Sequence, residues 1–205
     1  HEAGVDRIVL AFSSSTYGDS AELPKVEERI GRPLSPYAVS KYAAELYAEV
    51  FAKTYGLPFV GLRYFNVYGP REPHKKAAAS MIIQLYQQTK AGRRPRVFRA
   101  GEHKRDFVYV KDVVAMTIGA LGAARSTILN CGCGHPFSFN EVIAELNRAL
   151  GTALEPDYFE NPYSFYQPHT EADMTRAKTE LGFVPQYPPA RGIADGRDVQ
   201  LVPER

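Results

Sequence analysis

The chain has 205 residues, of which 44% are hydrophobic and 23% charged, enough for one large domain or one and a half small ones. Its 25 basic and 23 acidic side chains leave a formal net charge of +2, which gives no reason to expect nucleic acid or a membrane surface as a partner. No apolar run approaches the roughly 20 residues of a membrane helix, and no secretion leader is visible, so we expect a cytoplasmic location.

An apolar strand and an amphipathic helix come first. The run "RIVLAF" over 7–12 is apolar at consecutive positions after Arg7, which is typical of a strand covered on both faces. A helix is predicted over 38–53, and Gly56 and Pro58 end it. Its apolar side chains follow the i, i+3, i+4, i+7 spacing of a stripe that faces the core. The stripe consists of Ala43, Leu46, Tyr47, Val50 and Phe51.

Strands and helices continue to alternate after residue 58, which predicts an α/β fold with a largely parallel sheet. We expect the two strands on either side of residue 100 to flank a hairpin-like loop. The tail over 185–205 is rich in Pro, Gly and charge, so we expect it to be loosely held. The strands are predicted at 59–69, 94–98, 105–110 and 127–132, and the helices at 77–92, 111–124, 138–151 and 173–183.

Two short motifs make local predictions. Ser138 and Glu141 have the spacing of a capping box at the start of a helix. Cys131 and Cys133 are separated by one residue, so a disulfide between them would be strained, and two cysteines cannot complete a four-ligand zinc site. We interpret them as inert buried thiols in a reducing compartment and predict no metal site; redox or metal chemistry is the alternative.

The stretch "SPYAVSK" places Tyr37 and Lys41 four residues apart at a helix start, where their Cβ atoms lie about 5–6 Å apart on one face. A free tyrosine has a pKa of about 10, so acting as a base near neutrality requires roughly 4 kcal/mol. An ammonium about 6 Å away supplies roughly 3 kcal/mol of this at an effective dielectric constant of about 20. A helix N-terminus and a cationic cofactor could supply the rest. General acid–base chemistry is therefore predicted; the alternative is a surface tyrosine beside a solvated lysine.

A hydroxyl group is also needed to hold a substrate oxygen while a proton moves. The turn "SSSTYGD" follows the strand at 7–12, and parallel sheets present functional groups at the carboxyl ends of their strands. Ser13, Ser14 and Ser15 are therefore candidates, with a purely structural polar turn as the alternative.

Together, "SSSTYGD", "SPYAVSK", "GLRYFNVYGP" and "KRDFVYVKDV" resemble the extended short-chain dehydrogenase/reductase family of nucleotide-sugar epimerases and dehydratases. The resemblance implies a partial doubly wound, Rossmann-type parallel sheet with a smaller α/β substrate domain. It places 1–68 and 106–133 in the dinucleotide-binding domain, and 69–105 and 134–205 in the substrate domain. The family's Gly-x-x-Gly-x-x-Gly turn is absent, so we expect that roughly the first third is missing and that this piece alone is inactive.

The resemblance also implies roles for individual residues. Tyr37 matches the general acid/base, Lys41 tunes it and binds the cofactor ribose, and Ser13 matches the active-site hydroxyl. The cofactor is a tightly held NAD or NADP. Positions near its nicotinamide are matched by Tyr64, Phe65 and Val67.

Two further residues match substrate contacts in the family. Asn66 matches a contact to the sugar, and Arg105 matches the arginine that grips the nucleotide diphosphate, a role that suits a guanidinium fork. The alternative for Arg105 is an ion pair with Asp106.

The sequence does not single out one sugar as the substrate. Dehydratases carry Thr-Asp-Glu in place of the three serines, so a dehydratase is disfavoured. "GPREPHKKAAASM" resembles ADP-glyceromanno-heptose 6-epimerases, in which Lys75 would be a second acid/base and Tyr166 a substrate contact. Lys75 could instead be solvated or bind phosphate, and Ala77 and Gln84 depart from that pattern. Residues 33–72 look equally like UDP-glucose and UDP-N-acetylglucosamine 4-epimerases.

We therefore expect an NAD(P)-dependent nucleotide-sugar epimerase, an isomerase that oxidises its sugar transiently to a ketone or aldehyde. The heptose 6-epimerase type is slightly favoured over the UDP-hexose 4-epimerase type. A non-catalytic dinucleotide sensor and a sugar-nucleotide reductase are further alternatives. The family resemblance implies a homo-oligomer that pairs through helix 38–53 when the protein is complete.

Overall fold

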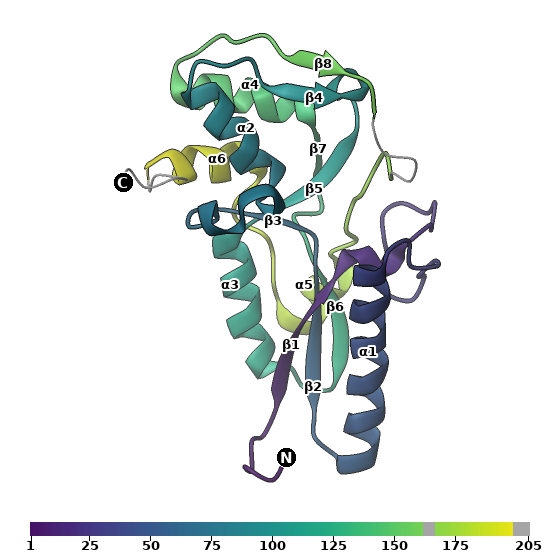
Figure 1. The fold of residues 1–205 in the computed structure, drawn as a ribbon. Coiled ribbons are helices and arrows are strands. Elements are labelled where there is room, and N and C mark those ends of the chain that lie inside the picture. Colours follow the sequence, from purple (N-terminus) through teal and green to yellow (C-terminus); the bar gives the residue numbers. More distant parts are fainter. Residues whose placement is uncertain (162–166, 199–205) are drawn as a thin grey trace.

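The computed structural model describes residues 1–161 and 167–198 (Figure 1). The predicted contact Tyr166 lies outside these residues. Three parallel strands form one sheet in the order β1 (Ile8–Ser13), β2 (Phe59–Tyr64) and β6 (Thr127–Cys131). The helices α1 (Pro36–Tyr55) and α3 (Val110–Gly119) lie on opposite sides of this sheet (Figure 1). Its core includes the fully buried Val60, Leu62, Met116 and Leu129.

A second sheet of short strands lies beyond the carboxyl end of the first (Figure 1). The strand β5 (Lys104–Tyr109) lies between a parallel β3 (Asn66–Tyr68) and an antiparallel β7 (Pro136–Ser138). A parallel pair, β4 (Arg96–Phe98) and β8 (Asp157–Phe159), covers the far end. The remaining helices are α2 (Met81–Lys90), α4 (Phe139–Leu150), α5 (Thr175–Leu181) and α6 (Pro189–Asp198), with 3-10 turns η1 (Ser14–Tyr17), η2 (Pro73–Ala78), η3 (Arg99–Gly101) and η4 (Ala120–Gly122).

The alternating strands and helices confirm the predicted α/β class. The first buried cluster, around β2 and β6, also contains Ala172 and Ala177 from the C-terminal part of the chain. A second buried cluster joins α2, α4 and β5 to Ile193 of α6. The division into two domains at the predicted boundaries stays a prediction.

Capping residues form hydrogen bonds at the ends of α1 and α4. The Ser35 side chain accepts from the Ala38 backbone N–H at 3.1 Å, and Gly56 ends α1 with φ of 69°. The Glu141 backbone N–H donates to Ser138 Oγ at 3.1 Å, and the Ser138 backbone N–H donates to Glu141 Oε2 at 2.7 Å. The predicted capping box is thus confirmed. These hydrogen bonds hold the pKa of Glu141 below its usual value.

Two predictions about chain organisation are wrong. The strands β4 and β5 do not form a hairpin, because β4 pairs with β8 and β5 pairs with β3 and β7. The tail is not loose over 189–198, where it forms α6 and buries Ile193, which is 1% exposed. In both places, contacts distant in sequence decide the outcome.

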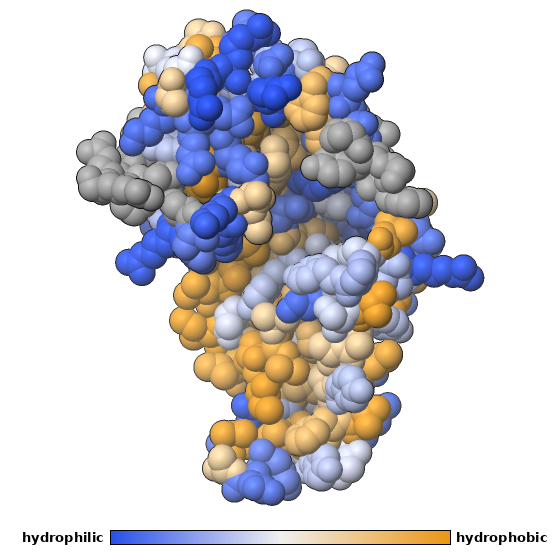
Figure 2. Space-filling model, viewed as in Figure 1, coloured by the Kyte–Doolittle hydropathy of each residue, from blue (hydrophilic) through white to orange (hydrophobic). Residues whose placement is uncertain are grey.

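The predicted core-facing stripe of α1 is also wrong. Leu46, Tyr47, Val50 and Phe51 are 46%, 77%, 61% and 41% exposed. Apolar residues gather on the surface of the lower half of the molecule, the half that contains α1 and α3 (Figure 2). The buried residues of this helix are instead Ala38 and Glu45, at 2% exposure each. In the part of the chain that the structure describes, none of the helices combines the length and the apolar character needed to cross a membrane.

Candidate active site

The first two turns of α1 meet the carboxyl end of β1. Lys41 Nζ lies 5.8 Å from the centre of the Tyr37 ring and donates to the backbone carbonyl oxygen of Ala11 at 3.0 Å. Ala11 precedes Ser13 by two residues on the same strand, and Tyr37 is 56% exposed. The structure therefore brings Ser13, Tyr37 and Lys41 to one end of β1, with the phenol and the ammonium on one face of the helix.

Ser13 begins the tight turn η1. Its Oγ accepts from the Ser15 backbone N–H at 3.2 Å, and its carbonyl oxygen accepts from Thr16 Oγ1 at 2.9 Å. The turn ends at Gly18, whose φ is 52° and where a Cβ atom would lie 1.8 Å from the Arg32 carbonyl oxygen. Only glycine fits there. Ser13 thus forms the polar turn, and its contact with a substrate stays a prediction.

A buried polar network fixes this turn and α1 to the sheet. Tyr17 of η1 donates to Asn130 Oδ1 of β6 at 2.5 Å, and Arg63 Nη1 of β2 donates to the Tyr17 hydroxyl at 3.2 Å. Arg63 also pairs with Glu45 of α1. Burial raises the pKa of Tyr17 to about 12. Burial alone would lower the pKa of Arg63, but its hydrogen bonds with Glu45 raise it.

Sequence reasoning missed this network. The signal that could have found it is Arg63 itself, a charge in the middle of the apolar run "FVGLRYF". A charge in a strand covered on both faces needs a buried partner of opposite sign, and a glutamate on a neighbouring helix was the obvious candidate.

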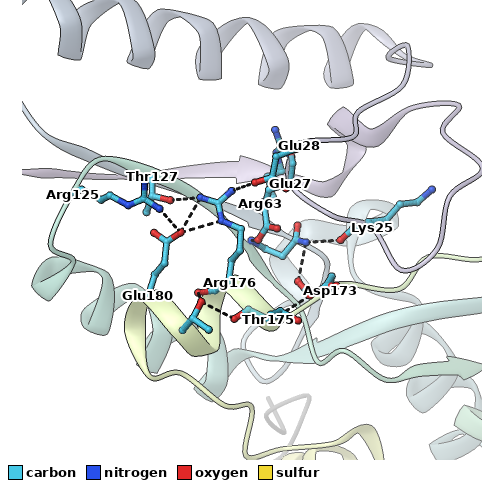
Figure 3. Close-up of polar contacts among 12 residues, drawn as sticks. Lys25, Glu27, Glu28, Arg63, Arg125, Thr127, Asp173, Thr175, Arg176 and Glu180 are labelled. Carbon is cyan, nitrogen blue, oxygen red and sulfur yellow. Dashed lines mark hydrogen bonds and ion pairs between the residues drawn. The ribbon is translucent and has the colours of Figure 1, made fainter.

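A second polar group joins the loop after η1 to α5 (Figure 3). Asn130 Nδ2 donates to the carbonyl oxygens of Lys25 at 2.7 Å and Asp173 at 3.1 Å. Arg176 of α5 donates to Thr127 Oγ1 of β6 at 2.8 Å and pairs with Glu28 at 2.5 Å. The C-terminal segment is therefore attached to β6, which belongs to the same sheet as β1 with Ser13.

Asn66 and Arg105 lie on the neighbouring strands β3 and β5. Asn66 Nδ2 donates to the Asp106 carbonyl oxygen at 3.1 Å. Arg105 is half-buried, and its Nη1 donates to the Lys104 carbonyl oxygen at 2.7 Å. The two predicted substrate contacts thus lie on paired strands, while their roles stay predictions.

Lys75 lies in a third segment, η2, and its Nζ is 3.4 Å from Glu72 Oε2, with 42% of its side chain exposed. Glu72 is buried and accepts from the Gly69 and Ser80 backbone N–H groups at 3.0 and 2.9 Å. The hydrogen bonds of Glu72 therefore hold the loop that carries Lys75 in place. The structure shows an ion-paired, accessible lysine, so its predicted part in catalysis stays a prediction.

The three residues predicted near a nicotinamide ring differ in exposure. The Tyr64 hydroxyl lies 3.0 Å from Thr117 Oγ1, and burial raises the pKa of Tyr64. Phe65 is 6% exposed, and its ring centre lies 6.1 Å from that of Tyr17. Val67 packs partly buried against the first cluster. Their part in a cofactor site stays a prediction.

Both cysteines are free thiols. Burial raises the pKa of Cys133 to about 12 and raises that of Cys131 as well, with Asp106 as the next cause. Thiols with such pKa values are poor nucleophiles at neutral pH, which supports their interpretation as inert. Among the described residues, no group of three or more His, Cys, Asp or Glu is placed to hold a metal ion.

Residues 1–132 match the model of the NAD dependent epimerase/dehydratase family. The chain belongs to this family. Among solved structures, the ADP-L-glycero-D-manno-heptose-6-epimerase of Helicobacter pylori is 34% identical with a TM-score of 0.85, over 94% of this chain and 59% of that chain. The UDP-glucose 4-epimerase of Thermotoga maritima is 31% identical with a TM-score of 0.89, over 96% and 64%. The UDP-N-acetylglucosamine 4-epimerase of Methanobrevibacter ruminantium is 27% identical with a TM-score of 0.87, again over 96% and 64%.

These comparisons confirm the family and the Rossmann-type fold that the four motifs indicated. The chain spans about three fifths of the length of these solved epimerases. The residues at the end of β1 suit the nicotinamide and ribose end of the NAD that the family uses. An accessible phenol, an ammonium and a hydroxyl suit ribose and substrate oxygens, whereas no Gly-x-x-Gly-x-x-Gly turn occurs in the sequence to cradle the pyrophosphate.

Proposed function

We propose that the complete protein containing this chain is an NAD-dependent nucleotide-sugar epimerase. The observation that supports this most directly is the placement of Tyr37, Lys41 and Ser13 at one end of β1, with Lys41 Nζ 5.8 Å from the Tyr37 ring. This is the donor set that reversible oxidation of a sugar hydroxyl requires: an acid/base, a cation beside it and a hydroxyl to hold the oxygen.

Each residue has a distinct task in this proposal. The Tyr37 phenolate takes the proton of the sugar hydroxyl and later returns it. The Lys41 ammonium stabilises the phenolate electrostatically and donates to oxygens nearby, as it does to the Ala11 carbonyl. Ser13 Oγ holds the reacting sugar oxygen. NAD would supply the hydride acceptor and donor, and Tyr64, Phe65 and Val67 are the residues that would hold its nicotinamide end.

The substrate class follows from the second pair of residues. Arg105 would grip the diphosphate of a nucleotide sugar, because a guanidinium presents paired N–H donors to phosphate oxygens, and Asn66 would contact the sugar. Lys75 is the proposed second acid/base for a heptose 6-epimerase. It is accessible and lies on a loop fixed by Glu72, which favours this type over the UDP-hexose 4-epimerase, the second candidate.

The first test is Tyr37→Phe in the complete protein, with Tyr47→Phe on the exposed face of α1 as a matched control. Removing a general acid/base typically costs 10²–10⁴-fold in rate. We expect Tyr37→Phe to lower turnover of the preferred nucleotide sugar by roughly that factor and the control to leave it unchanged. Full activity of Tyr37→Phe on every sugar nucleotide would favour a sensor instead.

A second test separates the two epimerase types. Wild-type protein, Lys75→Ala and the control Lys76→Ala are incubated with ADP-heptose, UDP-glucose and UDP-N-acetylglucosamine. In the heptose type, only Lys75→Ala abolishes epimerisation of ADP-heptose. Turnover of a UDP-hexose that survives Lys75→Ala would assign the 4-epimerase type.

A further inference from the structure

Asp106 of β5 is a fully buried carboxylate held by backbone amides. Its Oδ1 accepts from the Cys133 N–H at 2.6 Å, and its Oδ2 accepts from the Gly134 and Ala172 N–H groups at 2.9 Å each. The three donors come from two segments, the turn after β6 and the chain leading to α5. One side chain therefore joins β5 to both.

The turn after β6 is shaped to receive this carboxylate. A Cβ atom on Gly132 would lie 2.6 Å from the Ala172 Cβ and 3.0 Å from both oxygens of Asp106. Gly134 has φ of 70°, in the left-handed region that favours glycine. The glycines of "NCGCG", rather than its cysteines, thus explain the motif.

The backbone of Asp106 makes two more bonds that reach the candidate substrate site. Its N–H donates to Thr170 Oγ1 at 3.3 Å, and its carbonyl oxygen accepts from Asn66 Nδ2 at 3.1 Å. Thr170 Oγ1 also lies 3.5 Å from Asn66 Nδ2. A carbonyl oxygen can only accept, so Asn66 must turn its NH₂ group to Asp106, which leaves its Oδ1 to accept from a sugar hydroxyl.

The same segment fixes the strand at Arg105. The Lys104 N–H donates to the Pro168 carbonyl oxygen at 2.9 Å, and the Lys104 carbonyl oxygen accepts from the Thr170 N–H at 3.2 Å. Arg105 therefore lies between two residues that are each bonded to residues 168–172. Its backbone has little freedom to shift along β5.

We infer that Asp106 and Thr170 are positioning residues that set Asn66 and Arg105 for the nucleotide sugar; this inference rests on the proposed function. Neither contacts the substrate in this scheme. The Asp106 carboxylate holds residues 133–134 and 172 against β5 through hydrogen bonds. The Thr170 hydroxyl orients the Asn66 amide through the Asp106 backbone. Their loss should weaken substrate binding more than the chemical step.

The test measures kcat and KM of the complete protein for Thr170→Val and Thr170→Ser. Valine removes the hydroxyl at nearly constant volume, whereas serine keeps it. We expect Thr170→Val to raise KM about tenfold, a loss of one positioning hydrogen bond, with kcat changed less than about threefold. Thr170→Ser should restore KM, and NAD retention through gel filtration should be unchanged in both.

A matched structural control is Asp112→Asn. Asp112 is also buried, at 2% exposure, and its carboxylate accepts from the Gln186 and Tyr187 N–H groups at 2.9 and 2.8 Å. It performs the same kind of backbone locking for a different segment. Asp106→Asn and Asp112→Asn should lower the unfolding midpoint alike, but only Asp106→Asn should raise KM.

The outcomes separate this inference from the proposed function. An unchanged KM in Thr170→Val, or a KM rise equal in Asp112→Asn and Asp106→Asn, overturns the inference and leaves the epimerase standing. If wild-type protein turns over no nucleotide sugar, the proposed function is wrong. The positioning role of Thr170 is then tested by calorimetry, which measures how tightly the wild-type protein and its variants bind ADP and UDP. Weaker binding by Thr170→Val that Thr170→Ser restores supports it; equal binding by both overturns it.

Discussion

Arg63 and Glu45 form a bidentate ion pair that fastens α1 to the first sheet. Arg63 Nη2 lies 2.7 Å from Glu45 Oε2, and Arg63 Nε lies 3.0 Å from Oε1. Their side chains are 5% and 2% exposed. Because α1 carries Tyr37 and Lys41 and the sheet carries Ser13, the geometry of the candidate active site depends on this attachment.

We predict that Glu45→Gln destabilises the protein by about 3–5 kcal/mol, since it leaves the Arg63 charge buried without a carboxylate. Urea unfolding followed by circular dichroism measures this. The control is Glu22→Gln, which breaks an ion pair with Arg29 whose side chains are 55% and 69% exposed; such a surface pair contributes about 0–1 kcal/mol. Equal, small effects of the two changes would contradict the prediction.

The raised pKa of Tyr17 predicts a loss of stability in alkali. Its pKa is about 12 in the folded protein and about 10 in an unfolded chain. The buried neutral phenol therefore contributes its full stability below pH 10, and this is lost as pH rises from about 10 to 12, by about 3 kcal/mol in total. Between about pH 10 and 12, we expect the unfolding free energy of the wild-type protein to fall by about 3 kcal/mol more than that of Tyr17→Phe. Parallel pH profiles of the two proteins would refute it.

Signals confined to a few residues predicted the fold well. The capping box of Ser138 and Glu141 and the helix end at Gly56 were predictable because the groups that bond are neighbours in sequence. Strand pairing is different, because each residue of β4 pairs with a residue of β8 that is 61 positions later, and no local pattern encodes that choice. Ile193, one buried side chain in a polar tail, gave too weak a signal to predict α6.

The candidate site was predictable where a motif is contiguous. Tyr37 and Lys41 are four residues apart, so helical geometry alone brings them together. The amide cradle of Asp106 was not predictable, because its donors at 133, 134 and 172 meet only in the folded chain. The periodicity of α1 showed that one face is apolar, but periodicity does not say whether that face meets the sheet or solvent.

The exposed stripe on α1 predicts self-association. Tyr47 is 77% exposed, with Leu46, Val50 and Phe51 beside it, and contiguous apolar surface of this kind marks interaction sites. We expect the complete protein to sediment as a dimer and Tyr47→Arg to sediment as a monomer. Val184→Arg, at an exposed apolar position that follows α5 and lies outside α1, should remain a dimer. A wild-type monomer, or a dimer that survives Tyr47→Arg, would contradict a role for this face.

Gly132 and Gly119 should respond in opposite ways to a single added methyl group. At Gly132, the new Cβ would meet Asp106 and Ala172 at 2.6–3.0 Å, and overpacking of this kind typically costs 1–3 kcal/mol. Gly119 ends α3 with no atom within 4 Å of an added Cβ, and alanine in a helix is favoured over glycine by roughly 0.5–1 kcal/mol. We therefore expect Gly132→Ala to lower, and Gly119→Ala to hold or raise, the unfolding free energy in urea. Gly132→Ala should push Ala172 and Asp106 apart, so we expect it to raise KM as Thr170→Val does. A stable Gly132→Ala variant with the wild-type KM would mean that the turn after β6 does not constrain Asp106.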